Sequence, residues 1–367
     1  MNLAFFISSH GFGHAARAAA VMAALHARHP ALHFEIFTQV PRRFFEDSLA
    51  GPFNHHPALT DIGLVQTSPL SEDLPQTVQR LNEFLPFDEA HVSELAAQVR
   101  HCALVLCDIA PLGIAVARTA GIPSVLIENF TWDWIYEGYR ADAPGLQPHI
   151  DTLHGVFNSA DYHIQTAPAC DDARPAHLVT RPVSRSARTP TARIRERLGL
   201  PLQAKAVLLT MGGVEGEYNF LDRLGQQRAV YFVIPGGSDS HERRGNVVLL
   251  PHHSGFFHPD LLNACDAVVG KLGYSTLAEA YQAGIPFGYI QRPRFRESAV
   301  LAAYIQAEMR GLEIPAAHFE DGSWLSALPA LLALPRIERR GPNGAVEVVG
   351  FISQLLKLST DSLRRNG

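Results

Sequence analysis

The chain repeats one pattern along its length: a short, continuous apolar run, a loop rich in glycine or proline, and then a helix-forming segment. Apolar runs without alternation predict strands that are buried on both faces, and strands that alternate with helices predict parallel sheets. In the first half the expected strands are 3–8, 33–38, 103–108 and 124–128, and the expected helices are 15–28, 84–100 and 109–120. The sequence therefore predicts a doubly wound α/β fold.

The pattern is interrupted once and then begins again. Residues 166–195 hold Pro168, Pro175, Pro182 and Pro190, which is typical of the last strands of a domain followed by a linker. After Pro201, strands are expected at 206–210, 230–234, 247–250, 267–270 and 287–290, with a helix at 277–283. We expect two Rossmann-like domains, 1–185 and 186–345, with a cleft between them. A last helix within 346–367 is expected to pack across their junction.

Composition excludes several classes of protein. Among the 367 residues, 47% are apolar and 18% are charged, which is enough for large cores, and a net charge of −5 argues against a protein that coats nucleic acid. No apolar run reaches the roughly 18 residues that span a bilayer. The N-terminus lacks the features of a signal peptide, so a cytoplasmic location is expected. The four cysteines form no C-x-x-C pair, and buried free thiols are expected.

The loop after the first expected strand carries the first motif. Gly11, Gly13 and Ala16 fit G-x-G-x-x-A between a strand and a helix, which is the context of a dinucleotide site. Such a site needs an acid about 20 residues later. Glu35 has that spacing but lies inside the second expected strand, so the match to a nicotinamide or flavin enzyme is incomplete.

Two histidines in the same loop indicate different chemistry. His10 and His14 are expected at the mouth of the sheet, where a histidine can take a proton from an acceptor hydroxyl. Asp108 ends another expected strand at the same mouth and can orient His14 or contact the acceptor. The alternatives are structural: the imidazoles cap a helix or bond a neighbouring loop, and Asp108 caps a helix.

The second motif is a glycine turn that opens a helix. Gly273, Tyr274, Ser275 and Thr276 follow an expected strand, and the free N–H groups at a helix N-terminus bind phosphate. Glu279 lies one turn later, where a carboxylate can accept two ribose hydroxyls, or serve only as a favourable first-turn acid. No Walker A loop, D-x-D or H-E-x-x-H pattern occurs, so no metal site is expected.

Two further segments invite a functional interpretation. Gly212 and Gly213 open the second domain, and glycines there let the backbone approach a diphosphate. Residues 129–139 are rich in aromatic side chains, and the i, i+2 spacing of Trp132 and Trp134 predicts a loop or an irregular turn. Aromatic faces suit sugars and isoprenoid chains, and core packing is the alternative.

Together these motifs resemble the GT-B glycosyltransferases, especially the branch whose enzyme adds N-acetylglucosamine to lipid I. Residues 273–279 match that branch's donor signature G-[AG]-x-T-x-x-E except at Tyr274. The chain is similar, more closely still, to the N-terminal glycosyltransferase-like half of plant L-arabinokinases, at residues 10–17, 129–136 and 270–276. The resemblance spans nearly the whole chain, and the sugar-kinase half has no counterpart in it.

The resemblance implies a metal-independent, inverting transfer of a sugar from a nucleotide sugar, expected to be a UDP-sugar, to a hydroxyl acceptor, with no other cofactor. His14 would be the general base, supported by Asp108 or His10. Contacts to the nucleotide sugar would come from Gly11, Gly13, Gly212, Gly213, His253, Gly273, Tyr274, Ser275, Thr276, Glu279, Arg294 and Glu297. The family's nucleobase lies near the loop that holds His252, His253 and Phe256, where stacking and a plain loop are equal alternatives.

The donor loop departs from the family. It commonly carries an acid and a glutamine that contact the sugar, whereas residues 292–298 hold three arginines, and Glu297 stands where the glutamine is expected. The arginines either bind phosphate or an acidic sugar, or form a solvated face. The lipid-linked branch also makes a peripheral membrane contact, which is an expectation here that no amphipathic basic helix requires.

Three other functions remain open. They are a nucleotide-sugar epimerase, a non-catalytic nucleotide-sugar sensor, and an oxidoreductase that binds NAD at residues 11–16. The sequence names neither the sugar nor the acceptor, and it leaves the oligomeric state open.

Overall fold

The computed structural model describes residues 1–68, 70–212 and 219–365, with side chains as far as residue 357. The chain divides into two compact units. The first consists of Met1–Ser184, Phe295–Glu297 and Pro342–Gly367, and the second of Arg185–Arg294 and Ser298–Gly341. The predicted α/β class with parallel sheets is confirmed in both units.

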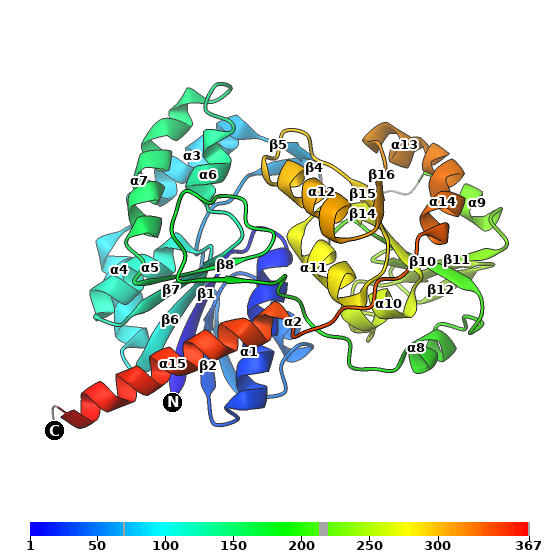
Figure 1. The fold of residues 1–367 in the computed structure, drawn as a ribbon. Helices are drawn as coiled ribbons and strands as arrows, with labels where there is room; N and C mark the ends of the chain where they lie inside the picture. The colour runs from blue at the N-terminus through cyan, green and yellow to red at the C-terminus, as the bar shows by residue number, and fades with distance from the viewer. Residues whose placement is uncertain (69, 213–218, 366–367) are drawn as a thin grey trace. The chain divides into compact units, whose positions relative to one another are not determined.

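The first unit is built on a seven-stranded sheet with the order β3-β2-β1-β6-β7-β8-β9 (Figure 1). Its strands are β1 (Asn2–Ile7), β2 (His33–Phe37), β3 (Phe53–His56), β6 (Cys102–Asp108), β7 (Ser124–Glu128), β8 (Tyr162–Thr166) and β9 (Leu178–Thr180), and all of them pair in parallel. A small hairpin, β4 (Gln66–Ser68) with β5 (Ser71–Glu72), lies outside this sheet. The chain runs outward from β1 in one direction and from β6 in the other, so the strand order reverses between these two strands.

Helices cover both faces of this sheet because successive residues of a strand point to opposite sides. Leu3 and Phe5 of β1 pack in a core with α1 (Gly13–Arg28) and α15 (Gly344–Arg365). Ala4 and Phe6 pack in the opposite core, against the helices α4 (Glu89–Val99), α5 (Pro111–Ala120) and α7 (Gln147–Asn158). The remaining helical segments of this unit are α2 (Arg42–Glu46), α3 (Leu74–Phe84), α6 (Trp132–Glu137) and η1 (Pro144–Leu146).

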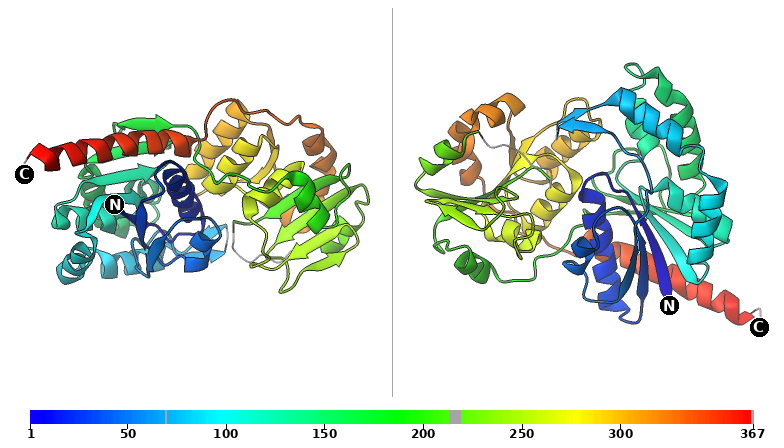
Figure 2. Two further views of the ribbon diagram at one scale, coloured as in Figure 1. Left: turned by 90° about the horizontal axis from the view of Figure 1, so that it is seen from below. Right: turned by 180° about the vertical axis from the view of Figure 1, so that it is seen from behind.

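The C-terminal helix belongs to the first unit. Val348, Val349 and Ile352 of α15 are buried in the core that α1 also lines, and Figures 1 and 2 show α15 (red) lying beside α1. The sequence had suggested a helix packed across the domain junction. In the structure, the buried face of α15 is covered by the sheet and helices of the first unit.

One predicted helix is wrong in extent. The sequence suggested a single helix over 84–100, and the structure has α3 ending at Phe84 and α4 beginning at Glu89. The second helix has its own start because Asp88 caps it: the Asp88 carboxylate accepts a hydrogen bond of 2.8 Å from the backbone N–H of His91.

The second unit repeats the topology, with the order β12-β13-β11-β10-β14-β15-β16. Its strands are β10 (Lys205–Thr210), β11 (Val230–Pro235), β12 (Glu242–Arg244), β13 (Val247–Leu250), β14 (Ala267–Lys271), β15 (Phe287–Ile290) and β16 (Gly311–Glu313). The edge strand β12 is antiparallel to β13, and the other pairs are parallel. Here the order reverses between β10 and β14.

Helices lie on both faces of the second sheet as well. One core joins the sheet to α8 (Thr191–Arg197), α10 (His258–Ala264), α11 (Tyr274–Ala283) and α12 (Glu297–Glu308). On the other face, Trp324 packs edge-on against Phe220 and against Phe232 of β11. The helical segments of this second layer are α9 (Leu221–Gly225), α13 (Ala316–Asp321), η2 (Ser323–Ala327) and α14 (Leu328–Ala333) (Figure 1).

Gly270 is required by the close approach of two central strands. A Cβ atom at Gly270 of β14 would lie 1.8 Å from the backbone oxygen of Thr210, whereas a Cβ atom at Gly273 would meet no atom within 4 Å. We expect Gly270→Ala to lower the free energy of unfolding by about 3 kcal/mol, because backbone atoms must move apart. Gly273→Ala is the matched control. Urea denaturation measures the free energy of unfolding of the two variants, and equal values would mean that Gly270 is not required by the close approach of the strands.

Candidate functional site

The carboxyl ends of β1 and β6 form the candidate site of the first unit. In open parallel sheets, ligands bind where the strand order reverses, outside the carboxyl ends of the two central strands. The loop after β1 carries His10 and leads into α1, whose second residue is His14, and β6 ends at Asp108. The topology therefore brings together these three residues, which the sequence proposed as catalytic. Gly11 of the same loop has a φ of +74° and is exposed, and Gly13 begins the helix.

His14 and Asp108 are in contact. The Nδ1 atom of His14 lies 3.3 Å from Oδ1 of Asp108, and their exposed fractions are 8% and 2%. Asp108 does not cap the following helix, because the N-cap of α5 is Ala110. Of the two roles predicted for Asp108, orientation of His14 has direct geometric support.

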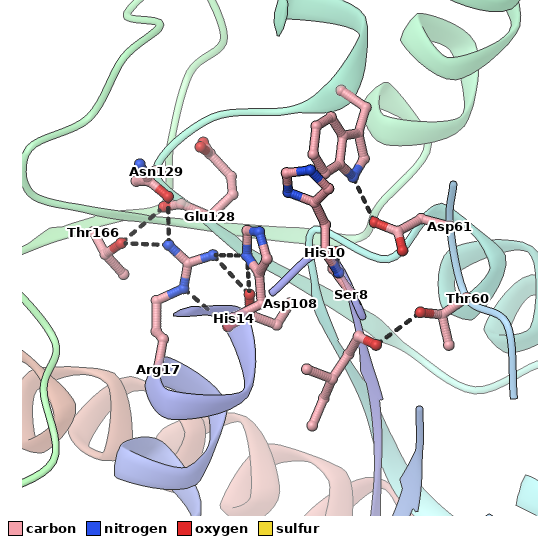
Figure 3. A network of polar contacts seen from close by, with 12 residues as sticks. Ser8, His10, His14, Arg17, Thr60, Asp61, Asp108, Glu128, Asn129 and Thr166 are labelled. Atoms are coloured by element: carbon pink, nitrogen blue, oxygen red, sulfur yellow. Dashed lines mark hydrogen bonds and ion pairs between the residues drawn. The ribbon is translucent and has the colours of Figure 1, made fainter. Parts of the chain in front are cut away.

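Sequence reasoning missed Arg17, which holds the Asp108 carboxylate. Arg17 is 1% exposed and donates from Nε to Oδ2 of Asp108 at 2.9 Å and from a terminal nitrogen to Oδ1 at 2.7 Å. Its other terminal nitrogen donates to Oδ1 of Asn129 at 2.6 Å and to the hydroxyl of Thr166 at 3.3 Å (Figure 3). The signal for Arg17 was its position three residues after His14, which places both side chains on one face of a helix.

Charge keeps Asp108 ionised. Burial by itself would raise the pKa of the Asp108 carboxyl, but the neighbouring Arg17 guanidinium, its hydrogen bonds and the contact with His14 together hold that pKa below its usual range. Ile109, the next residue, has a φ of +54°, which is unusual for a β-branched side chain. Backbone strain of this kind is concentrated at functional sites.

A second buried carboxyl group, Asp61, lies beside the same loop and was also missed. Trp132 donates from its indole nitrogen to Oδ2 of Asp61 at 2.5 Å, and Ser8 also hydrogen-bonds the carboxyl group. Burial raises the pKa of Asp61, and the hydrogen bonds and the nearby His14 only partly oppose this. The two carboxyl groups near His14 therefore have pKa values shifted in opposite directions, a pattern found at acid–base sites.

The aromatic segment after β7 is a short helix, and the predicted loop or irregular turn is wrong. Residues two apart lie on different sides of a helix, and each tryptophan of α6 has its own partner. Trp132 is 1% exposed and packs on Tyr136, with the ring centroids 5.8 Å apart. Trp134 lies under the guanidinium of Arg296 at 4.0 Å. Trp132 and Tyr136 are therefore core residues, as the structural alternative held.

Two other predicted site residues, His10 and Glu297, have different neighbours from each other. The ring of His10 packs edge-on against Trp132, with centroids 5.0 Å apart, and lies close to Gly63. Glu297 is 3% exposed, and its carboxylate accepts a hydrogen bond of 2.8 Å from Asn129. Because Asn129 also accepts from Arg17, Glu297 is linked through these two residues to Asp108.

The second unit has an equivalent reversal point between β10 and β14. Gly212 follows β10 with a φ of +73°, and Lys271 ends β14. A Cβ atom at Gly212 would lie 3.6 Å from the Lys271 ammonium nitrogen, so this cation lies against the loop proposed to approach a diphosphate. Lys271 was not among the predicted ligands. Gly213 lies outside the described residues.

The predicted phosphate-binding helix is α11. Its N-cap is Gly273 and no side chain caps it, so its first N–H groups are not bonded by a capping side chain. Ser275 is half-buried in the first turn, while Tyr274 and Thr276 are buried. The sequence correctly predicted a helix N-terminus after a glycine turn here.

Glu279 is buried, and an arginine and a histidine already contact its carboxylate. Its exposed fraction is 3%, Arg185 donates to Oε1 at 3.0 Å, and Nδ1 of His258 lies 2.7 Å from Oε2. Burial would raise the pKa of the Glu279 carboxyl, but the charges and hydrogen bonds of Arg185 and His258 hold it below its usual range. Neither partner was predicted, because both come from other segments of the unit.

The remaining predicted ligands are near the surface of the second unit. His253 and Arg294 are exposed. The guanidinium of Arg197 lies over one face of the Phe256 ring, 4.1 Å from the ring centroid.

Metal clusters, membrane-spanning helices and cysteines were searched for among the described residues. Within them, no group of three or more His, Cys, Asp or Glu side chains is arranged to hold a metal ion. No helix in this part of the chain is both long and apolar enough to cross a membrane. All four cysteines are free thiols, and Cys102, Cys107 and Cys265 are buried.

Comparison with known proteins adds a curated relative. No protein-family profile matches the chain. L-arabinokinase of Arabidopsis thaliana is 27% identical over 361 residues, which are 96% of this chain and 34% of that protein. The chain thus spans about a third of the length of this relative.

Solved structures share the architecture. VinC, a glycosyltransferase in complex with dTDP, has a TM-score of 0.60 at 15% identity, covering 98% of this chain and 100% of its own. The chain has a GT-B fold. Medicago truncatula UGT71G1 with UDP-glucose (TM-score 0.59, 15% identity, 98% of each chain) and Acinetobacter baumannii MurG (0.52, 15%, 96% and 99%) are also similar. The predicted resemblance to GT-B glycosyltransferases and to L-arabinokinase is confirmed.

The buried ion pairs predict a pH dependence of stability. A carboxyl group whose pKa is lowered by folding stabilises the fold above its unfolded pKa, about 4, and loses that contribution as the pH falls through its folded pKa. Glu279 and Asp108 are of this kind. We expect Glu279→Gln to lower the free energy of unfolding by about 3 kcal/mol at neutral pH, because Arg185 and His258 lose a buried anion.

Urea denaturation across an acidic pH series measures this effect. The stability of Glu279→Gln should fall less steeply with decreasing pH than that of the unsubstituted protein. Glu94→Gln is the control, because the Glu94 side chain is 70% exposed. A slope for Glu279→Gln equal to that of the control contradicts the assignment.

Proposed function

We propose that this chain transfers a sugar from a nucleotide-sugar donor to a hydroxyl acceptor, with His14 as the general base. The observation that carries the proposal is the contact between buried His14 and ionised Asp108 at the reversal point of a GT-B domain. A histidine so placed can accept the proton of a hydroxyl group as that group attacks the sugar. Attack by an acceptor activated in this way, in a single displacement, inverts the anomeric carbon.

Asp108 supports this chemistry through its charge and its position. When His14 takes up a proton, the Nδ1–H group has an acceptor at 3.3 Å in Asp108 Oδ1. The ring's other nitrogen, Nε2, is then the atom that receives the acceptor's proton. Burial of both side chains keeps the pair away from competing water, which strengthens their interaction.

The donor is proposed to bind at the reversal point of the second unit. The Lys271 ammonium lies beside Gly212, and the N-terminus of α11 offers N–H groups and a positive dipole end. These groups suit a diphosphate and would stabilise it as it leaves the sugar, without a metal ion being needed for that purpose. Ser275 in the first turn adds a hydroxyl donor.

The nucleotide is proposed to be UDP. VinC was solved with dTDP and UGT71G1 with UDP-glucose, and both ligands contain a pyrimidine nucleoside diphosphate. Glu279 remains the proposed ribose ligand. Each carboxylate oxygen has two lone pairs, so ribose hydroxyls can join Arg185 and His258 there, provided that a neighbouring side chain moves to expose the oxygens.

Donor binding is testable with two lysine variants. We expect Lys271→Met to weaken UDP binding by about tenfold or more, because the variant lacks a cation beside the diphosphate. Lys205→Met is the matched control, since Lys205 starts β10, at the opposite end of the strands, and pairs with Asp266. Calorimetric titration with UDP, dTDP, GDP, CDP and NAD measures the affinities. Tight NAD binding, or equal effects of both substitutions, contradicts the proposed donor site.

The base is testable separately. We expect His14→Ala to lower turnover by at least about 100-fold and to leave UDP affinity unchanged, because the base acts on the acceptor. The measurement is release of the nucleoside diphosphate from the donor, in the presence of a panel of hydroxyl acceptors. His91→Ala, at a half-exposed side chain on α4, is the control. Normal turnover by His14→Ala means that the base assignment is wrong.

A further inference from the structure

Arg17 lies closer to Asp108 than His14 does. Both oxygens of Asp108 accept from Arg17, at 2.7 and 2.9 Å, whereas His14 Nδ1 is 3.3 Å from Oδ1. A bidentate pair between a guanidinium and a carboxylate fixes the plane of the carboxylate. The orientation of Asp108 toward His14 is therefore set by Arg17.

Arg17 is itself fixed. Its side chain is 1% exposed, and Asn129 and Thr166 accept hydrogen bonds from the terminal nitrogen that does not contact Asp108. The guanidinium nitrogens thus reach acceptors on three segments: β6, the residues just after β7, and β8 (Figure 3). The strands β6, β7 and β8 are neighbours in one sheet. A cation held from three sides cannot move away when the charge of His14 changes.

The same guanidinium also faces His14 directly. One terminal nitrogen of Arg17 lies 3.4 Å from His14 Nδ1, nearly the same distance as Asp108 Oδ1 at 3.3 Å. The two unit charges are opposite, so their Coulomb effects on a proton bound to the ring nearly cancel. Without Arg17, the carboxylate alone would favour the imidazolium form.

We propose that Arg17 is a positioning residue that holds Asp108 against His14 while offsetting the negative charge of Asp108, so that the carboxylate orients the His14 ring and its attraction for a proton on that ring is opposed. An uncharged ring is what a general base needs before the reaction, because an imidazolium has no lone pair to accept a proton. The catalytic meaning of this arrangement rests on the proposed function. The charge balance itself does not, and it is measurable in the protein without substrates.

Three other side chains lie near the His14 ring and also affect its charge state. The carboxyl group of Asp61, on the loop that follows β3, interacts electrostatically with His14. Phe130 and Trp132, from the segment after β7, face the ring with apolar surfaces at centroid distances of 5.8 and 6.3 Å. None of the variants below alters Asp61, so its contribution is common to all of them.

A four-protein cycle tests the proposal. The proteins are the unsubstituted chain, Arg17→Met, Asp108→Asn, and the double variant Arg17→Met/Asp108→Asn. The titration midpoint of His14 is read from the pH dependence of its ring Cε1–H NMR signal, assigned by the signal lost in His14→Gln. His91, on the solvent side of α4, gives an internal reference that should not change.

The expected shifts have opposite signs. Arg17→Met leaves an unopposed anion and should move the midpoint up by about one pH unit, and Asp108→Asn leaves an unopposed cation and should move it down by about as much. The double variant should return near the original midpoint. If the charges of the pair did not act on the His14 ring, the midpoint would stay unchanged in all three variants.

Failure of the proposal is distinguishable from failure to fold and from failure of the proposed function. Arg17→Met leaves Asp108 buried without its cation, and if that variant does not fold, Asp108→Asn and the double variant still decide. An unchanged midpoint in Asp108→Asn, or a double variant that does not return, overturns the charge balance. The shifts are read without donor or acceptor, so they are independent of whether the chain transfers sugar.

Discussion

The buried ion pair between Arg17 and Asp108 joins the elements that make the first site. A carboxylate that is 2% exposed is costly unless a cation and hydrogen bonds compensate it, and Arg17 provides both. The pair ties α1 to the end of β6, and Asn129 and Thr166 extend the connection to the segments at the ends of β7 and β8. His14 lies on α1 three residues before Arg17, so the anchoring of Arg17 also holds the turn of helix that carries His14.

The second unit uses the same physical solution in a different place. Glu279 is buried, an arginine and a histidine engage its two oxygens, and its pKa is held low in spite of burial. Asp108 has the same kinds of partner, Arg17 and His14. The difference is position: Asp108 ends a central strand, whereas Glu279 lies within α11, past the helix N-terminus that is proposed to bind phosphate.

The fold was largely predictable because its signals are local. Continuous apolar runs predicted three strands with the bounds that the structure has: Ser124–Glu128, Val247–Leu250 and Phe287–Ile290. Glycine turns marked the starts of α1 and α11. Where a local signal was ambiguous, the prediction was wrong: α6 was expected to be irregular, and the cap at Asp88 that separates α4 from α3 was overlooked. His14 and Asp108 could be proposed together because one follows the end of β1 and the other ends β6, and the structure places them in contact.

The cations that compensate Asp108 and Glu279 could not be assigned to them from the sequence, because each is distant in sequence from its carboxylate. Arg17 and Asp108 are 91 residues apart, and Arg185 and Glu279 are 94 apart. Asp61 and His258 likewise acquire their meaning only from packing. Sequence patterns report the periodicity of an element, and they do not report which charged side chain will compensate another in the folded core.

We propose that the nucleotide of a sugar donor binds at the reversal point of the second unit, and a crystal structure of the protein with UDP would locate it. We expect the diphosphate beside Gly212, Lys271 and the first turn of α11, with the ribose toward Glu279. Diphosphate density on the loop of Gly11 and Gly13 instead would exclude this donor site and favour a dinucleotide-binding protein.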